Sequence, residues 1–207
     1  MKLFYSKGAC SLAPHIVLAE LNMVYEIEAV DLRSKSCPSG DFWKINAKGS
    51  VPALRMESGD ILTEGQVISR YLADMKPEIG LIPRPGTLER YRCEEWLSYI
   101  SSELHKNFSP LFMPNVFVQN EDGMSELKAS MHGILKKKVA YVSEQLADND
   151  YLMGKQFSVA DAYLFTVLSW SNYVKFDLST WSNLSAYMKR VSARPGVVRA
   201  MKEEGML

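Results

Sequence analysis

The chain has 207 residues and a mass of 23.4 kDa, which is enough to bury one large core or two smaller ones. Its 24 Lys and Arg residues balance 24 Asp and Glu residues, so no net charge would recruit a nucleic acid or an anionic membrane. No apolar run reaches the roughly 18 residues that a membrane span needs, and the sequence has no secretory signal pattern, so we expect a cytoplasmic protein.

The first part of the chain predicts a strand, a helix and a second strand. Residues 2–5 are largely apolar, residues 11–21 carry apolar side chains at helical spacing, and residues 25–30 alternate between apolar and polar side chains. The polar stretch over residues 35–48 has no regular period, so we expect it to be irregular.

A hairpin and a helix are predicted next. Residues 53–56 and 61–62 flank a Ser-Gly-Asp turn, which indicates two antiparallel strands. A helix follows over residues 65–75, with Thr63 and Gln66 expected to form a capping box at its start. The order of a βαβ unit, two further strands and a helix is that of a thioredoxin-like domain.

The remainder of the chain is predicted to be helical. The stretch over residues 76–86 holds three prolines and two glycines, a composition typical of a linker between domains. Apolar side chains then recur every three or four residues, among them Leu97, Ile100, Leu104, Phe108, Leu127, Met131, Ile134, Leu135, Val139, Val142 and Leu146. We expect a thioredoxin-like domain over residues 1–78, a linker over 79–86 and an all-helical bundle domain over 87–207.

One helix start in this second part is marked by its own motif. Ser158 and Asp161 have the spacing of a reciprocal cap, and residues 162–170 are apolar nearly all round. These features predict a central helix of the bundle, and we assign the motif to folding and not to chemistry.

Cys10 and Ser11 lie where the first strand turns into the first helix, so their side chains would face backbone N–H groups that have no intrahelical partner. Lowering a thiol pKa by about two units requires about 2.7 kcal/mol. A helix N-terminus supplies about 0.3–1 kcal/mol and a hydrogen bond to an anion about 1.5–3 kcal/mol. We therefore expect stabilisation of a ligand thiolate here, and a lowered pKa of Cys10 itself. The alternative is a buried cysteine beside a helix-capping serine.

The first helix has no Cys-x-x-Cys motif, because residue 13 is alanine, so a second thiol would have to come from a ligand. Cys37 and Cys93 complete a set of three cysteines that cannot all pair and that lack metal-ligand spacing. Free thiols are typical of a reducing compartment, and we expect no metal.

Three further features are suited to peptide groups and carboxylates. Val51-Pro52 either begins an edge strand or contains a cis bond that turns the backbone of Val51 outward to pair with an extended peptide. Glu64-Gly65 is either a simple cap or a carboxylate site at a helix start, and Lys35 is either solvated or a partner for a second carboxylate. A ligand with a carboxylate at each end, peptide groups between them and a central thiol would use all of these features. Glutathione is such a ligand.

A set of short motifs extends along the chain: Lys2-Leu3-Phe4-Tyr5, Gly8-Ala9-Cys10-Ser11-Leu12, Asn46-x-Lys48-Gly49-x-Val51-Pro52-Ala53-Leu54, Leu62-Thr63-Glu64-Gly65, Glu103-Leu104-His105-Lys106, Phe157-Ser158-Val159-Ala160-Asp161-Ala162-Tyr163 and Arg194-Pro195. With these motifs the chain resembles the bacterial beta-class glutathione S-transferases over nearly its whole length. The combination of Cys10-Ser11 with His105-Lys106 is specific to that class, and the other motifs mark the wider superfamily.

The resemblance implies the glutathione transferase fold and a homodimeric enzyme of detoxification. Such an enzyme conjugates the thiolate of its co-substrate glutathione to small, mostly apolar electrophiles, without a metal and without a nucleic-acid or membrane partner. It also implies that Cys10 contacts glutathione or forms a mixed disulfide with it, and that Ser11 and His105 help to polarise the sulfur.

The resemblance further implies a set of glutathione-binding residues, namely Tyr5, Lys35, Val51, Pro52, Glu64, Gly65, Ser98, Ser102, Glu103 and Lys106. In this set Val51 pairs with the cysteinyl backbone, Glu64 and Gly65 hold the γ-glutamyl end, and Lys35 holds the glycyl carboxylate. Ser98 stands where relatives commonly have Asn, which bears on a contact with the neighbouring subunit. The electrophile is expected against Phe108, Phe112, Met113 and Tyr163.

Other interpretations remain open. The protein could be a glutathione-dependent thiol-disulfide reductase or peroxidase that works through a mixed disulfide at Cys10, or a non-catalytic dimeric adaptor of the same fold. His105 could equally be a packed or surface residue if the resemblance is set aside, and we expect His15 and His132 to be structural or solvated.

Overall fold

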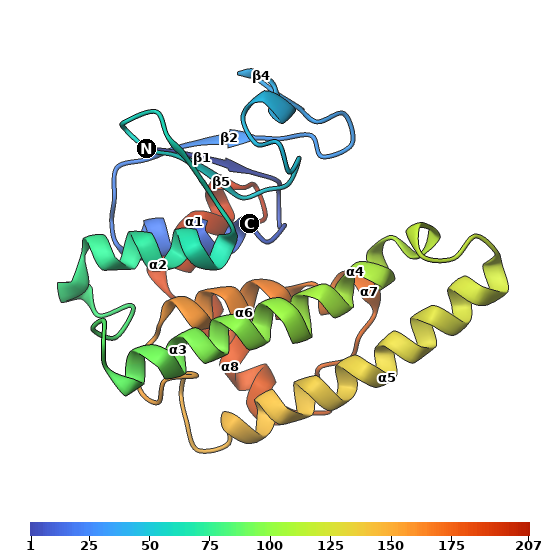
Figure 1. The fold of residues 1–207 in the computed structure, drawn as a ribbon. Coiled ribbons are helices and arrows are strands. Elements are labelled where there is room, and N and C mark those ends of the chain that lie inside the picture. Colours follow the sequence, from blue (N-terminus) through green and yellow to red (C-terminus); the bar gives the residue numbers. More distant parts are fainter.

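A mixed four-stranded sheet forms the first part of the molecule (Figure 1). The computed structural model describes all residues 1–207. The sheet has the order β2-β1-β5-β6 and consists of β1 (Lys2–Tyr5), β2 (Glu26–Ala29), β5 (Ala53–Arg55) and β6 (Ile61–Thr63). β1 pairs parallel with β2 and antiparallel with β5, and β5 pairs antiparallel with β6. The predicted βαβ unit, hairpin and thioredoxin-like arrangement are confirmed.

Both faces of β1 are buried, because successive side chains of a strand point to opposite faces. Leu3 and its cross-strand partner Leu54 are part of the main core. Phe4 and its partner Ala53 pack with Phe42 in a small second core. The sheet is therefore a fixed platform for the loops that leave its strands.

Helix α1 (Leu12–Glu20) lies at the centre of the molecule. It contacts α2 (Gly65–Met75), α6 (Val159–Ser169) and α9 (Pro195–Glu203). Because it is covered on all sides, every residue from Leu12 to Ala19 is buried. The end of the chain returns with α9 to the sheet side of the molecule, next to α1 (Figure 1).

The stretch over residues 35–48 contains short regular elements that the sequence did not indicate. They are β3 (Ser36–Cys37), β4 (Gly40–Asp41) and η1 (Phe42–Lys44). Strands of two residues have no detectable period, which is why this stretch appeared irregular.

The second part is helical, as predicted. It contains α3 (Leu88–Tyr99), η3 (Ile100–His105), α4 (Lys106–Phe112), η4 (Pro114–Val116), α5 (Glu121–Gln145), α6, α7 (Ser171–Val174), α8 (Ser182–Ser192) and α9, after a short turn η2 (Pro77–Ile79). Figure 1 shows α3 and α4 as one nearly continuous rod with α5 beside it. None of the helices combines the length and the apolar character needed to span a bilayer.

The predicted core positions are mostly buried. Leu97, Ile100, Leu104 and Phe108 are fully buried. On α5 the exception is Ile134, which is 40% exposed although we expected it on the apolar face. The division at residues 79–86 stays a prediction, because one continuous core includes side chains from both parts of the chain.

The predicted cap of α6 is confirmed and extends beyond its own helix. The Ser158 N–H donates to Asp161 Oδ2 at 2.9 Å and the Ser158 hydroxyl donates to the same oxygen at 2.7 Å. Asp161 Oδ1 accepts from the Leu152 N–H at 2.8 Å and from the Tyr187 hydroxyl at 3.1 Å. A fully buried carboxylate thus holds three segments together.

The predicted capping box at the start of α2 is wrong. Glu64 is the residue before the helix and makes no side-chain cap. The Thr63 hydroxyl instead accepts from Lys48 Nζ at 3.0 Å. The start of α2 therefore keeps its backbone N–H groups free.

Candidate active site

A cleft of about 530 Å³ lies between the loops of the sheet and the helical part. Both parts of the chain contribute predicted site residues to its lining: Cys10, Lys35, Val51, Pro52, Glu64 and Gly65 from the first, and His105, Lys106, Met113 and Tyr163 from the second. The cleft therefore unites predicted site residues as far apart in sequence as Cys10 and Tyr163.

Other predicted site residues lie outside this lining. Ser98 and Ser102 are exposed on the α3–η3 rod, and Glu103 forms an ion pair with Lys138 of α5. Phe108 is fully buried in the core, whereas Phe112 is 44% exposed at the end of α4.

Tyr5 and Ser11 also lie outside the lining. The Tyr5 ring packs near His15, with ring centroids 6.2 Å apart. The Ser11 side chain is fully buried, and its hydroxyl accepts from the Ser6 N–H at 3.1 Å and donates to the Ser6 carbonyl at 3.2 Å. The Ser11 hydroxyl is thus part of the turn before α1, and its expected role toward a ligand sulfur stays a prediction.

Cys10 lines the cleft as a neutral thiol. Its Sγ donates to the Val51 carbonyl at 3.2 Å. Burial raises the pKa of Cys10 to about 11 and outweighs the backbone N–H groups of Cys10 and Ser11, which act in the opposite direction. The expectation that the helix start lowers the pKa of Cys10 is therefore wrong, because the desolvation of a buried thiolate exceeds the contribution of the helix dipole.

The backbone beside Cys10 offers hydrogen-bond donors. The Val51–Pro52 peptide bond is cis, and the Val51 N–H makes no hydrogen bond within the chain. At the start of α2 the N–H groups of Gly65 and Gln66 are also without partners, and both residues line the cleft. A row of free N–H groups at a helix N-terminus favours an anion.

Glu64 has an unusual backbone conformation, with φ at 70°. A positive φ strains a residue that has a side chain, and such strain is concentrated at functional sites. The Glu64 carboxylate lies beside Lys48, with Oε1 and Nζ 2.5 Å apart, and both side chains are exposed. The rim of the cleft therefore carries a negative and a positive group beside the free N–H groups of α2.

Lys35 is held at the cleft by the backbone. Its Nζ donates to the Gly49 carbonyl at 2.8 Å and lies 5.9 Å from the centre of the Trp43 ring. Gly49 has φ at 61°, and a Cβ there would come within 2.5 Å of the Trp43 ring. This fixed contact directs a positive charge toward the cleft.

His105 lines the cleft from its helical part. Its Nδ1 is 2.7 Å from the Tyr163 hydroxyl. Burial, with a smaller contribution from Lys106, lowers the pKa of His105 to about 4, so the imidazole is neutral at neutral pH. Burial also raises the pKa of the Tyr163 hydroxyl, which stays protonated. The two walls of the cleft thus present uncharged hydrogen-bonding groups.

The segment that carries His105 is a π-helix, which the sequence did not predict. Residues Ile100–His105 form this turn between α3 and α4. π-helical turns are rare and are frequent at functional sites. Ser101, one turn before His105, also lines the cleft.

Sequence reasoning missed several lining residues besides Ser101, namely Ala9, Leu32, Asn46, Lys48, Gly49, Ser50, Thr63 and Gln66. Asn46 is the one with a recognisable signal. Its side chain donates to the Ser50 carbonyl at 2.6 Å and accepts from the Lys48 N–H at 3.1 Å, which shapes the turn before Val51. An Asn followed by Gly three residues later is a common turn pattern.

Comparison with known proteins gives consistent matches. The family model of the glutathione S-transferase N-terminal domain matches residues 8–75 and that of the C-terminal domain matches residues 99–195. The chain is 44% identical to the glutathione S-transferase GstA of Escherichia coli O157:H7 over 207 residues, which is all of both chains. Two solved structures, each matched over the full length of both chains with a TM-score of 0.92, are a bacterial beta-class glutathione S-transferase of Sphingomonas chungbukensis, 44% identical, and a sphingomonad glutathione S-transferase complexed with glutathione, 43% identical.

Proposed function

We propose that the cleft binds glutathione and that the glutathione thiolate attacks a small electrophile there. The chain belongs to the glutathione S-transferase family. The observation that carries the proposal is the joint presence of four kinds of group in one cleft. These are the free N–H groups of Gly65 and Gln66, the free N–H of Val51, the Cys10 thiol and the Lys35 ammonium. In this order, the four kinds of group match one carboxylate, a peptide group, the sulfur and the second carboxylate of glutathione.

In this proposal the charged and uncharged groups have separate tasks. Gly65 with Glu64 and Lys35 bind the two ends of glutathione, and Val51 pairs with its cysteinyl backbone as in strand addition. The neutral Cys10 thiol and the neutral His105 imidazole then donate hydrogen bonds to the sulfur. One hydrogen bond to a charged acceptor contributes about 1.5–3 kcal/mol, which lowers a thiol pKa by about one to two units.

The reaction is a substitution at carbon. A carbon–sulfur bond forms while the bond to the leaving group breaks, and the leaving group departs with the electron pair. The proton of the glutathione thiol is lost to solvent when the thiolate forms. No group in this scheme is oxidised or reduced, so glutathione is a co-substrate and the scheme needs no redox cofactor.

The electrophile would lie against the helical wall of the same cleft. Met113 and Tyr163 are part of the lining, and Phe112 is exposed next to them at the end of α4. A methionine and aromatic rings tolerate apolar groups of varied shape. Phe108, expected in this set, is a core residue that supports Phe112, with ring centroids 6.4 Å apart.

Thiol-disulfide exchange at Cys10 is the second candidate, and the state of Cys10 disfavours it. Exchange needs an attacking thiolate, and a thiol with a pKa of about 11 is almost entirely protonated at neutral pH. We therefore propose that Cys10 acts as a hydrogen-bond donor in conjugation.

We also propose that the protein is a homodimer of the cytoplasm. α2 and α3 lie side by side, joined by the Arg90–Asp74 and Arg70–Glu94 ion pairs, and they expose Met75, Leu88 and Tyr91. Exposed apolar groups of this kind suit a second copy of the chain. The three free cysteines are suited to a reducing compartment.

The test compares two reactions in the wild type and in Cys10→Ala. We expect conjugation of 1-chloro-2,4-dinitrobenzene to fall about tenfold, the value of one lost hydrogen bond to the sulfur. We also expect the wild type to reduce a glutathione mixed disulfide no faster than Cys10→Ala, because exchange at Cys10 would need its thiolate. Cys37→Ala, which changes a thiol outside the cleft, should leave conjugation unchanged. If the wild type does not bind millimolar glutathione in calorimetry, or if Cys10→Ala has no conjugating activity at all, the proposal is wrong.

A further inference from the structure

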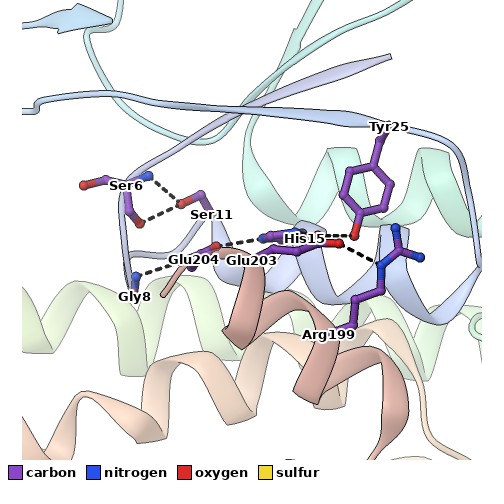
Figure 2. Close-up of polar contacts among 8 residues, drawn as sticks. All are labelled: Ser6, Gly8, Ser11, His15, Tyr25, Arg199, Glu203 and Glu204. Carbon is purple, nitrogen blue, oxygen red and sulfur yellow. Dashed lines mark hydrogen bonds and ion pairs between the residues drawn. The ribbon is translucent and has the colours of Figure 1, made fainter. Parts of the chain in front are cut away.

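The peptide group of Gly8, two residues before Cys10, is held from both sides by residues of the C-terminal half. Its N–H donates to Glu204 Oε2 at 2.8 Å (Figure 2). Its carbonyl accepts from the indole Nε1–H of Trp170 at 2.8 Å. We call this pair of bonds the Gly8 clamp. Because Gly8 has φ at 67°, the chain turns at this residue, and the clamp fixes the direction in which it continues to Cys10.

The carboxylate side of the Gly8 clamp is itself rigid. Glu204 is only 4% exposed, and its other oxygen, Oε1, is 2.9 Å from His15 Nδ1. The second ring nitrogen of His15 is 2.8 Å from Glu203 Oε2. Glu203 also accepts from the Tyr25 hydroxyl and from Arg199, as Figure 2 shows. The position of Glu204 is thus set by α1, α9 and the start of β2, and the loop of Gly8 follows it.

The indole side of the Gly8 clamp reaches the opposite wall of the cleft. The Trp170 ring meets the His105 ring nearly edge-on, with centroids 4.8 Å apart, and packs on Phe108 and Phe112 at 5.7 Å. Trp170 is 6% exposed and is not part of the cleft lining. One side chain therefore contacts both the loop that carries Cys10 and the imidazole of His105, which lines the same cleft.

We propose that Glu204 and Trp170 are positioning residues, which hold the Gly8 peptide so that the Cys10 thiol keeps its place beside Val51 in the cleft that His105 also lines. The proposal rests on glutathione transfer in this cleft, and neither residue touches the substrate. Without the clamp, the turn from Ser6 to Cys10 keeps its local bonds, such as Ala9 N–H to the Ser6 carbonyl and the Ser11 bonds to Ser6. Only two bonds to distant segments remain, from Lys7 Nζ to the Gly205 carbonyl and from Cys10 Sγ to the Val51 carbonyl. A displacement of about 1 Å at reacting groups can cost about a hundredfold in rate.

The test uses two conservative substitutions, each with a matched control. Trp170→Phe keeps an aromatic ring against His105 and removes the N–H donor, and Trp96→Phe changes a tryptophan on the far side of α3 that packs on Tyr99 and Tyr141. Glu204→Gln keeps the shape of the side chain and removes its charge. Its control, Glu20→Gln, removes a different carboxylate that joins α1 to the α9 segment, through Arg194, without touching the Gly8 loop.

Two readouts are needed. At a temperature well below the midpoint of unfolding, kcat for conjugation should fall about tenfold or more in Trp170→Phe and Glu204→Gln, while KM for glutathione stays within about threefold. The rate at which iodoacetamide modifies Cys10, followed on its peptide by mass spectrometry, should rise about threefold or more, because a loosened loop exposes the thiol. Both controls should keep kcat and Cys10 modification within about twofold of the wild type, whatever their effect on thermal stability.

Each deviation from this result overturns the proposal. If both variants behave like their controls, the clamp stabilises the fold and does not position Cys10. A fall in kcat with unchanged modification of Cys10 means that the loop has not moved, and faster modification with unchanged kcat means that its position does not matter. If the wild type lacks conjugating activity, the proposed function fails, and the modification rates still show whether the clamp holds Cys10.

Discussion

The protonation state of Cys10 can be measured directly, and it decides which chemistry the cleft performs. The perturbation is a rise in pH during modification with iodoacetamide, which reacts with the thiolate only. The pKa of Cys10 is about 11 in the structure, whereas that of a free cysteine is about 8.5. The difference of about 2.5 units leaves Cys10 with about 300-fold less thiolate than a free thiol at neutral pH.

The pKa of Cys10 is raised for two reasons. The thiol is partly buried and desolvated, which disfavours the anion, and its proton is donated to the Val51 carbonyl, a bond that only the neutral form can make. The backbone N–H groups at the start of α1 favour the anion but do not compensate for the burial. Cys10 should therefore react far more slowly than free glutathione at pH 7, and its rate should still increase tenfold per pH unit up to about pH 10.

The assay follows the Cys10 peptide by mass spectrometry over a pH series, with free glutathione in the same tube as the reference thiol. Cys93 is fully buried and should remain unmodified, so it reports whether the protein stays folded at each pH. An apparent pKa of Cys10 at or below about 8.5 would refute the reasoning. It would show that the helix start outweighs burial, and the preference for conjugation over disulfide exchange would lose its basis.

Further predictions concern His105, Asp161 and Gly65. The pKa of His105 falls from 6.5 to about 4 on folding, so as the pH falls the unfolded chain takes up a proton before the folded one does. In urea unfolding between pH 7.5 and 4.5, the wild type should lose about 2.5 kcal/mol more stability than His105→Phe. An equal loss in the two proteins would contradict this prediction. Asp161→Ala leaves the buried Ser158 and Leu152 N–H groups without acceptors. Calorimetry should show that the free energy of unfolding falls by about 3–5 kcal/mol and the Tm by about 10 °C. A fall in Tm of less than about 3 °C would contradict this prediction. Gly65→Ala adds a methyl group 3.5 Å from Pro52 Cγ and 3.9 Å from the Cys10 carbonyl oxygen, which are ordinary van der Waals distances. The Tm should therefore change by less than about 2 °C, while KM for glutathione rises several-fold. An unchanged KM would mean that glutathione binds elsewhere.

Much of the fold could be predicted because its signals are local. The apolar run of β1, the alternation in β2, the hairpin of β5 and β6, and the apolar spacing on the α3–α4 rod each extend over a few residues. The Ser158–Asp161 cap was also predicted from two residues of one turn, although the bonds of Asp161 to Leu152 and Tyr187 could not be. The π-helical turn Ile100–His105 was missed because one extra residue in a turn does not disturb the apolar spacing on either side.

The candidate site was predicted less completely, and the errors share a cause. The residues predicted to line the cleft were identified largely from motifs near helix starts and strand ends, and these residues do lie together in the structure. The motifs could not predict which residues from distant parts of the chain surround these side chains. The Cys10 thiol is neutral because of burial and a carbonyl 41 positions away, and Ser11 points to Ser6 because its other side is packed.

The same reasoning explains why the residues of the Gly8 clamp carried no sequence signal. A glutamate near the end of α9 and a tryptophan after α6 look like ordinary solvated and core residues. Their meaning depends on α9 returning to α1, which brings Glu204 within 2.8 Å of a residue 196 positions earlier. The loop that carries Cys10 is thus supported by residues distant in sequence, through the two bonds of Gly8. We therefore expect changes in the packing of α9 on α1 to alter the reactivity of Cys10 before they unfold the protein.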